Sequence, residues 1–123
     1  MALKAARDQF AQERGVSRPN VVLPSSAHAA FAKAGAYFGI ELRRTAVKSD
    51  WRADVEAMRS AVDENTIMIA CSAPQYPQGV IDDVPSVAAL ALELEINCHV
   101  DACMGGVSLA YLERLGRNIP SWN

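Results

Sequence analysis

This chain of 123 residues has no large excess of positive or negative charge. Its 12 basic and 14 acidic residues give a formal net charge of −2. No polybasic run is present to attract nucleic acid or an anionic membrane surface. No apolar run approaches the roughly 18 residues that a membrane-spanning helix needs. The first residues, MALKAARDQF, lack the apolar centre of a secretory signal. We therefore expect a cytoplasmic protein with no nucleic-acid partner.

Cysteine is also scarce. The odd count of three, without paired spacing, indicates reduced thiols rather than a disulfide framework. No C-x-x-C motif occurs, and the two histidines, His28 and His99, lie far apart in the sequence, so we expect no metal site. The three cysteines are Cys71, Cys98 and Cys103.

Aromatic residues are few, at 7%, although 50% of the residues are apolar. Alanine therefore has to fill much of the interior. A chain of this length and apolar content suits one domain with a real core. No internal repeat, low-complexity tract or linker divides it.

Four segments are predicted to be strands. The run TIMIACSA is continuously apolar and rich in β-branched residues, which is typical of a strand covered on both faces. A proline ends NVVLP, and IELRRTAV alternates in part. The predicted strands cover residues 20–24, 40–47, 66–73 and 97–102, the last of them expected to be buried.

Helices are predicted between these strands. Leu3, Ala6 and Phe10 recur at helical spacing, and Gly15 can end the first helix. Serine and aspartate are good helix caps. The predicted helices cover residues 2–14, Ser25 or Ser26 to about Phe38, a segment capped by Asp50, Asp82 or Asp83 to Glu95, and residues 108–116. Alternation of strands and helices indicates an α/β fold with a mostly parallel sheet flanked by helices.

Polar residues follow three of the predicted strands. His28 comes shortly after the first strand, Ser72 lies at the end of the third, and Asp101 ends the fourth, before Gly105 and Gly106. In open α/β sheets, ligands bind beyond the carboxyl ends of the strands. If the strands are neighbours and parallel, these residues converge on one cleft.

Each candidate residue has a structural and a functional interpretation. Asp101 could cap a turn or pair with an arginine, or it could hold a cationic ring nitrogen, because a buried carboxylate needs a partner. His28 is either a helix residue with a satisfied N–H or a flat imidazole laid against a planar cofactor. His99 should share a strand face with Asp101, either supporting the acid or filling the core. Cys103 fits a packed thiol better than a nucleophile, because no base lies nearby in the sequence.

Three motifs resemble one enzyme family. SSAHAAFAKAGAYFGIELRR, CSAPQYPQGVIDDVPSVAALA and CHVDACMGG together resemble the sphingosine-1-phosphate lyases, which are pyridoxal-phosphate enzymes related to the glutamate and aromatic amino-acid decarboxylases. The similarity covers essentially the whole chain. It implies part of an aspartate-aminotransferase-type large domain (pyridoxal-phosphate fold type I), and a homodimer for a full-length protein.

The resemblance also implies roles for individual residues. His28 would stack on the pyridine ring, Asp101 would pair with the ring nitrogen, and Cys103 would lie near the opposite ring face. Ser72 and the PQYPQG loop would line the cofactor side of the sheet. The implied reaction is retro-aldol cleavage of a phosphorylated long-chain amino alcohol to a fatty aldehyde and phosphoethanolamine.

The chain departs from the family pattern in two respects. The family needs a lysine to form a Schiff base with the cofactor, and that lysine follows the segment matching CHVDAC. Here the lysines are Lys4, Lys33 and Lys48, and residues 49–123 contain none. The glycine- and serine-rich phosphate loop that precedes the first helix is also missing. We therefore expect residues 1–123 to be a single partial domain, truncated at both ends, with no catalytic residue and no activity by itself.

Two other interpretations remain open. An amino-acid decarboxylase of the same fold would share the cofactor motifs. A non-catalytic α/β binding module is a second possibility, although neither G-x-G-x-x-G nor G-x-x-x-x-G-K-[ST] is present.

Overall fold

The computed structural model describes residues 1–122 and contains one four-stranded sheet in the order β2-β1-β3-β4. All three pairings between these strands are parallel, which confirms the predicted fold class. The strands are β1 (Asn20–Pro24), β2 (Glu41–Thr45), β3 (Thr66–Ser72) and β4 (Asn97–Asp101), and the helices are α1 (Ala2–Arg14), α2 (Ala30–Phe38), α3 (Val55–Ser60), α4 (Val84–Glu93) and α5 (Gly105–Arg114).

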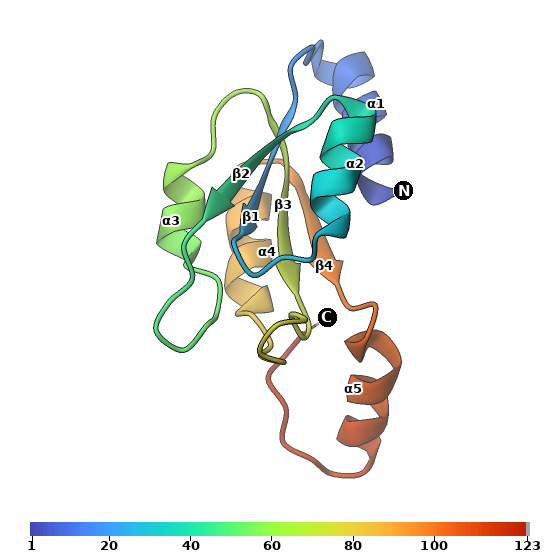
Figure 1. The fold of residues 1–123 in the computed structure, drawn as a ribbon, viewed down its shortest axis with the longest axis vertical. Coiled ribbons are helices and arrows are strands. Elements are labelled where there is room, and N and C mark those ends of the chain that lie inside the picture. The colour runs from blue at the N-terminus through green and yellow to red at the C-terminus, as the bar shows by residue number, and fades with distance from the viewer. Residues whose placement is uncertain (123) are drawn as a thin grey trace.

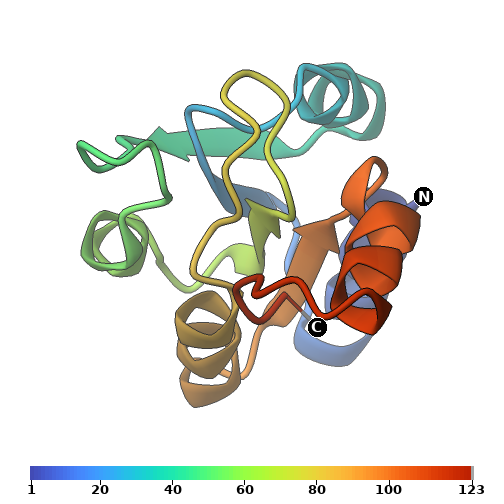
Figure 2. The ribbon, with the colours of Figure 1, turned by 90° about the horizontal axis from the view of Figure 1, so that it is seen from below.

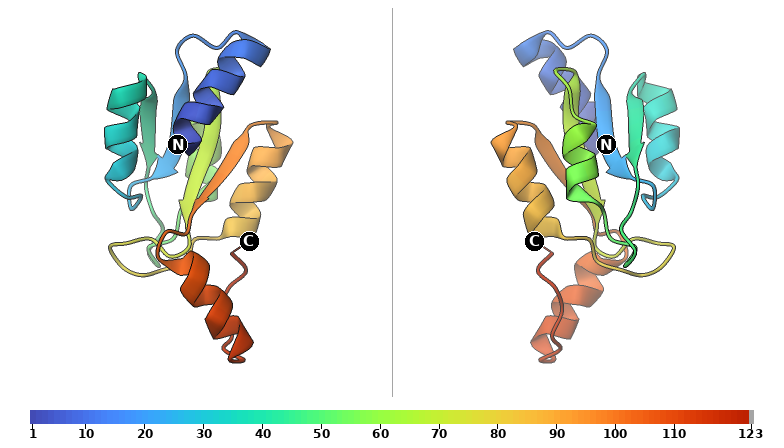
Figure 3. Two further views of the ribbon diagram at one scale, coloured as in Figure 1. Left: turned by 90° about the vertical axis from the view of Figure 1, so that its right-hand side faces the viewer. Right: turned by 90° about the vertical axis from the view of Figure 1, so that its left-hand side faces the viewer.

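Helices cover both faces of the sheet. Helices α1 and α2 lie on one side, and α3 and α4 lie on the other (Figure 1 and Figure 2). The fifth helix, α5, extends beyond the end of the sheet toward which the strands point (Figure 3). Within residues 1–122, no helix combines the length and the apolar composition that crossing a membrane requires.

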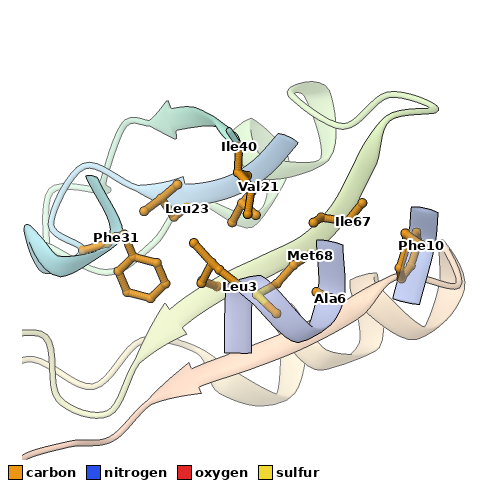
Figure 4. Close-up of a cluster of buried hydrophobic side chains, with 11 residues drawn as sticks. Leu3, Ala6, Phe10, Val21, Leu23, Phe31, Ile40, Ile67 and Met68 are labelled. Carbon is orange, nitrogen blue, oxygen red and sulfur yellow. The ribbon is translucent and has the colours of Figure 1, made fainter. Parts of the chain in front are cut away.

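Two apolar clusters hold these layers together. Leu3 and Phe10 of α1 pack with Val21, Leu23 and other buried residues on one face of the sheet (Figure 4). On the opposite face, strand residues pack against α3, α4 and α5. Because side chains alternate along a strand, successive residues of β3 from Met68 to Cys71 contribute to different clusters. Ala70 belongs to the first cluster and Cys71 to the second.

The two central strands are buried throughout, as their continuous apolar runs predict. The expectation that residues 97–102 form another buried strand is wrong. Strand β4 is an edge strand of the described sheet, and its residues are half-buried or exposed. No other strand within residues 1–122 pairs with its outer edge.

Two predicted helix caps are wrong. Helix α2 begins at Ala30, not after Ser25 or Ser26, because a turn follows β1 first. Asp50 does not cap the next helix. It lies in a loop in which Lys48 and Arg52 are hydrogen-bonded, and Asp54 caps α3 instead.

The cap of α4 is Asp83, one of the two residues that the sequence proposed. Its side chain accepts a hydrogen bond from the backbone N–H of Ser86. The other candidate, Asp82, is buried and has a different role, described below. The predicted C-terminal helix is present as α5 and begins earlier than expected, at Gly105.

Candidate functional site

The carboxyl ends of the parallel strands lie at the same end of the sheet, as their arrowheads show (Figure 1). Ser72 at the end of β3 is the register partner of Asp101 at the end of β4. The backbone N–H of Ala73 donates to the carbonyl oxygen of Asp101 at 3.0 Å. The structure therefore brings two of the predicted site residues, Ser72 and Asp101, side by side.

Asp101 lines a hollow with a volume of about 200 Å³. The wall also contains the first residues of α1, the first turn of α2 and His99. No lysine or arginine side chain is among the described residues that line it. Asp101 therefore brings a carboxylate to this surface without a lysine or arginine in the same wall.

His28 lies in the loop that leads into α2, and its side chain is exposed. Its Nδ1 atom accepts a hydrogen bond from the backbone N–H of Ala30 at 3.1 Å. A neutral imidazole that accepts at Nδ1 carries its proton on Nε2. Ala30 also lines the hollow with Asp101, so the structure places His28 beside the helix turn that forms one wall of the Asp101 hollow.

Cys103 follows Asp101 closely and is exposed. Its backbone N–H donates to Oδ1 of Asp101 at 3.2 Å, which orients the carboxylate. The hydrogen bond between its thiol and the Asp101 carboxylate raises the pKa of Cys103, and burial adds to that rise. A raised pKa keeps the thiol protonated, which does not favour a nucleophile. The expectation that Cys103 is a packed thiol is wrong, because its side chain is exposed.

His99 is half-buried in the wall of the hollow. Its ring meets Phe31 of α2 edge-on, with 6.0 Å between the ring centroids. Burial lowers the pKa of His99, against the opposing effect of the nearby Asp101 carboxylate. The lowered pKa favours the neutral form of His99 at pH 7.

Sequence analysis missed the role of Asp82. This carboxylate is only 1% exposed. It accepts hydrogen bonds from the backbone N–H groups of Ala53 at 2.7 Å and Ser72 at 2.8 Å. Burial raises the pKa of Asp82, although the two backbone hydrogen bonds act in the opposite direction. Asp82 thus fixes the end of β3 against the loop before α3.

Three further residues near the site have contacts or burial that sequence analysis did not predict. Tyr76 of the PQYPQG loop contacts His28, with ring centroids 5.9 Å apart. Gly105 lies so close to the backbone of Ala73 that a side chain would not fit. The hydroxyl of Ser26 is buried and has no hydrogen-bond partner within the described residues. A serine two positions before His28 was visible in the sequence, but its burial was not.

Comparison with known proteins decides the family. Residues 7–110 match the family described as Aminotransferase class-V. The chain belongs to this family. It is 51% identical over 116 residues to sphingosine-1-phosphate lyase 1 of Rattus norvegicus, which covers 94% of the chain and 20% of that relative. It is 43% identical over 123 residues to sphingosine-1-phosphate lyase of Arabidopsis thaliana, which covers 100% of the chain and 23% of that relative.

Solved structures that superpose on this chain have the same fold. Sphingosine-1-phosphate lyase of Burkholderia pseudomallei superposes with a TM-score of 0.96 at 39% identity, covering 99% of this chain and 28% of that one. Glutamate decarboxylase of Lactobacillus brevis superposes with a TM-score of 0.79 at 23% identity, over 92% and 28% of the two chains, which supports the fold alone. The expected aspartate-aminotransferase-type fold is confirmed, and the chain spans about a fifth of the length of the curated relatives it matches.

Proposed function

We propose that this chain forms part of the cofactor site of a pyridoxal-phosphate-dependent carbon–carbon lyase. The substrate is a phosphorylated sphingoid base, cleaved to a fatty aldehyde and phosphoethanolamine. The observation that carries the proposal is the position of Asp101, an acid at the carboxyl end of a parallel strand in a hollow whose described lining includes no lysine or arginine. The similarity to sphingosine-1-phosphate lyases over 94–100% of the chain supports the choice of reaction.

The residues present suit pyridoxal phosphate. A pyridine ring with a protonated nitrogen is a cationic N–H donor, and the described lining of the hollow offers Asp101 no lysine or arginine as a partner. The buried Ser26 hydroxyl has unused hydrogen-bonding capacity at the base of the His28 loop. When bound, the cofactor supplies an electron-withdrawing ring that stabilises a substrate carbanion.

Four residues would hold the ring. The carboxylate of Asp101 would keep the proton on the ring nitrogen and orient that nitrogen. The imidazole of His28 would stack on one face of the ring, Cys103 would lie near the other, and Ser72 would line the sheet side. The backbone N–H of Cys103 donates to Oδ1 of Asp101 and so restrains its carboxylate. These roles stay predictions until a cofactor complex is measured.

An amino-acid decarboxylase is the second candidate function. The probable L-tyrosine/L-aspartate decarboxylase of Methanothermobacter thermautotrophicus is 33% identical over 123 residues, which are 100% of this chain and 33% of that relative. Both candidates use the same residues of this chain to hold the cofactor, so they differ in the bond that is cleaved. The proposed full-length protein is a homodimer in either case.

The proposed function is tested with a chimera in which these 123 residues replace the matching segment of the Burkholderia pseudomallei lyase. We expect aldehyde release from a phosphorylated sphingoid base. We expect Asp101→Asn in the chimera to lower kcat/KM about 10- to 100-fold, because a hydrogen bond to a charged group is worth about 1.5–3 kcal/mol. The matched control is Glu13→Gln, which neutralises an exposed carboxylate at the far end of α1.

Three outcomes of this assay would count against the proposal. Release of carbon dioxide from an amino acid, without aldehyde release, would assign the decarboxylase function instead. A folded chimera that binds pyridoxal phosphate but cleaves neither substrate would remove both candidates. Equal activity of the Asp101→Asn and Glu13→Gln chimeras would remove Asp101 from the site.

The 123-residue chain by itself is expected to form no specific covalent bond with pyridoxal phosphate. Lys4 is paired with Asp8 on α1, Lys33 lies over the Tyr37 ring on α2, and Lys48 is in the loop after β2. Mixing equimolar cofactor and protein should give no stable band near roughly 420 nm, where lysine-linked pyridoxal phosphate absorbs. Borohydride reduction followed by peptide mass spectrometry checks this, and one stoichiometric lysine adduct would contradict it.

A further inference from the structure

Tyr76 is an exposed aromatic residue next to the candidate cofactor site. Its side chain is 69% exposed, yet its ring meets the imidazole of His28 with centroids 5.9 Å apart and an interplanar angle of 80°. T-shaped contacts between aromatic rings in this distance range are attractive. Such a contact engages at most one face of the imidazole, so the other face stays available to a flat ligand.

Hydrogen bonds of the neighbouring residue Gln75 hold the loop that carries Tyr76. The side chain of Gln75 is buried and makes hydrogen bonds with both ends of its amide. Its Oε1 accepts from the backbone N–H of Gln78 at 2.9 Å, and its Nε2 donates to Gln78 Oε1 at 2.6 Å. The backbone N–H of Gln75 donates to the carbonyl of Val80 at 2.9 Å. Tyr76 therefore projects from a braced turn.

His28 is restrained on its other side by the backbone. The hydrogen bond from the Ala30 N–H to Nδ1 fixes one edge of the imidazole. A single hydrogen bond at one ring atom still allows the ring plane to tilt about that bond. A second contact, from an aromatic ring on a braced loop, restricts this tilt.

We propose that Tyr76 is a positioning residue that fixes the plane of the His28 imidazole, so that its open face is presented to a planar cofactor ring. The proposal deepens the function proposed above and depends on it for the identity of the ring. Tyr76 acts here through His28 and has no assigned contact with substrate or cofactor. The aromatic ring, rather than the hydroxyl, carries this role.

The test uses the 123-residue chain with isotope-labelled histidine, observed by NMR. The chain has two histidines, so His99 serves as an internal reference for folding. In the wild-type chain and in Tyr76→Phe, we expect His28 to show the Nε2–H tautomer, a ring-current shift and restricted ring motion. Tyr76→Leu should remove the ring-current shift and increase the ring motion, while the His99 signals stay unchanged.

Tyr37→Leu is the matched control, because Tyr37 is equally exposed, at 70%, and contacts Lys33 instead of a histidine. It should leave the His28 signals as they are. The proposal is overturned if Tyr76→Leu leaves the shift and motion of His28 unchanged. It is also overturned if Tyr37→Leu changes them equally. A Tyr76→Leu chain that lost its fold would lose the His99 signals too, and the Tyr76→Ala chain then takes its place.

A binding measurement separates this proposal from the function on which it depends. The affinity of the chimera described above for pyridoxal phosphate is followed by fluorescence, and Tyr76→Leu in the chimera is expected to weaken it about three- to tenfold, with Tyr76→Phe close to the unsubstituted chimera. If the unsubstituted chimera folds but binds no pyridoxal phosphate, the proposed function fails, and the NMR result alone decides whether Tyr76 positions His28. If Tyr76→Leu frees the imidazole but the Tyr76→Leu chimera binds the cofactor as tightly as the unsubstituted chimera does, the positioning role is wrong.

Discussion

Replacing Gly105 with alanine is expected to destabilise the chain by about 3 kcal/mol, at the upper end of the usual cost of overpacking. A Cβ atom at this position would lie 1.9 Å from the carbonyl oxygen of Ala73 and 2.7 Å from Cδ of Pro74. The first of these is a backbone atom at the end of β3 and has no rotamer by which to move away. Helix α5 would have to shift away from the sheet. Urea denaturation followed by circular dichroism measures the loss.

Gly106 provides the matched control for this prediction. A Cβ atom there would come no closer than 3.8 Å to Ala102. Gly106→Ala should therefore be neutral or should stabilise α5, by up to about 1 kcal/mol, because alanine loses less conformational entropy in a helix than glycine does. Equal losses in the two variants would contradict the steric explanation, as would an unchanged denaturation midpoint for Gly105→Ala.

Replacing Asp82 with alanine is expected to cost about 3 kcal/mol of unfolding free energy, because two buried backbone donors lose their acceptor at about 1–3 kcal/mol each. These donors are the N–H groups of Ala53 and Ser72. Thermal or urea unfolding measures the effect. Asp83→Ala is the control, because this neighbour is an exposed helix cap whose loss should cost about 1 kcal/mol. A smaller effect at position 82 than at position 83 would contradict the assigned role.

The pH dependence of stability provides a second measurement on Asp82. Burial raises its pKa above the ordinary value of 3.8, so the native state retains this proton more strongly than the unfolded state. The part of the stability that is linked to this proton is then fully present below pH 3.8 and is lost as pH rises through the raised pKa, whereas the two accepted backbone hydrogen bonds contribute in addition to it. The difference in unfolding free energy between wild type and Asp82→Asn should change in that direction with rising pH. A difference that is constant from pH 4 upward would contradict the assigned burial effect.

Much of the fold could be predicted because the relevant signals are local. The continuous apolar runs at residues 20–24 and 66–73 identify the two strands that are buried on both faces. Helical spacing identifies α1, with its buried Leu3, Ala6 and Phe10. The caps of α2 and α3 were predicted wrongly. Helix α2 begins after Ala29 without a side-chain cap, because a turn separates it from the two serines. Asp54 rather than Asp50 caps α3, because Asp50 lies in the preceding loop, and the sequence does not show where that loop ends.

The candidate site was predictable only in outline. Ser72 and Asp101 could be placed at strand ends, but their pairing required the order of the strands in the sheet. The contact between His28 and Tyr76 joins two loops that are 48 positions apart, and no periodicity encodes it. The assignment of His28, Ser72, Asp101 and Cys103 to a cofactor stays a prediction.

The sequence by itself determined the alternation of strands and helices, the family motifs, and the absence of any lysine after Lys48. These features depend only on the order of residue types along the chain, so the sequence is enough to identify them. Only the tertiary structure decided that β4 lies at an edge, that Asp82 is buried, and that Gly105 touches the backbone of Ala73. Each of these depends on which distant segments pack together, and that choice is made by the burial of whole surfaces rather than by neighbours in the sequence.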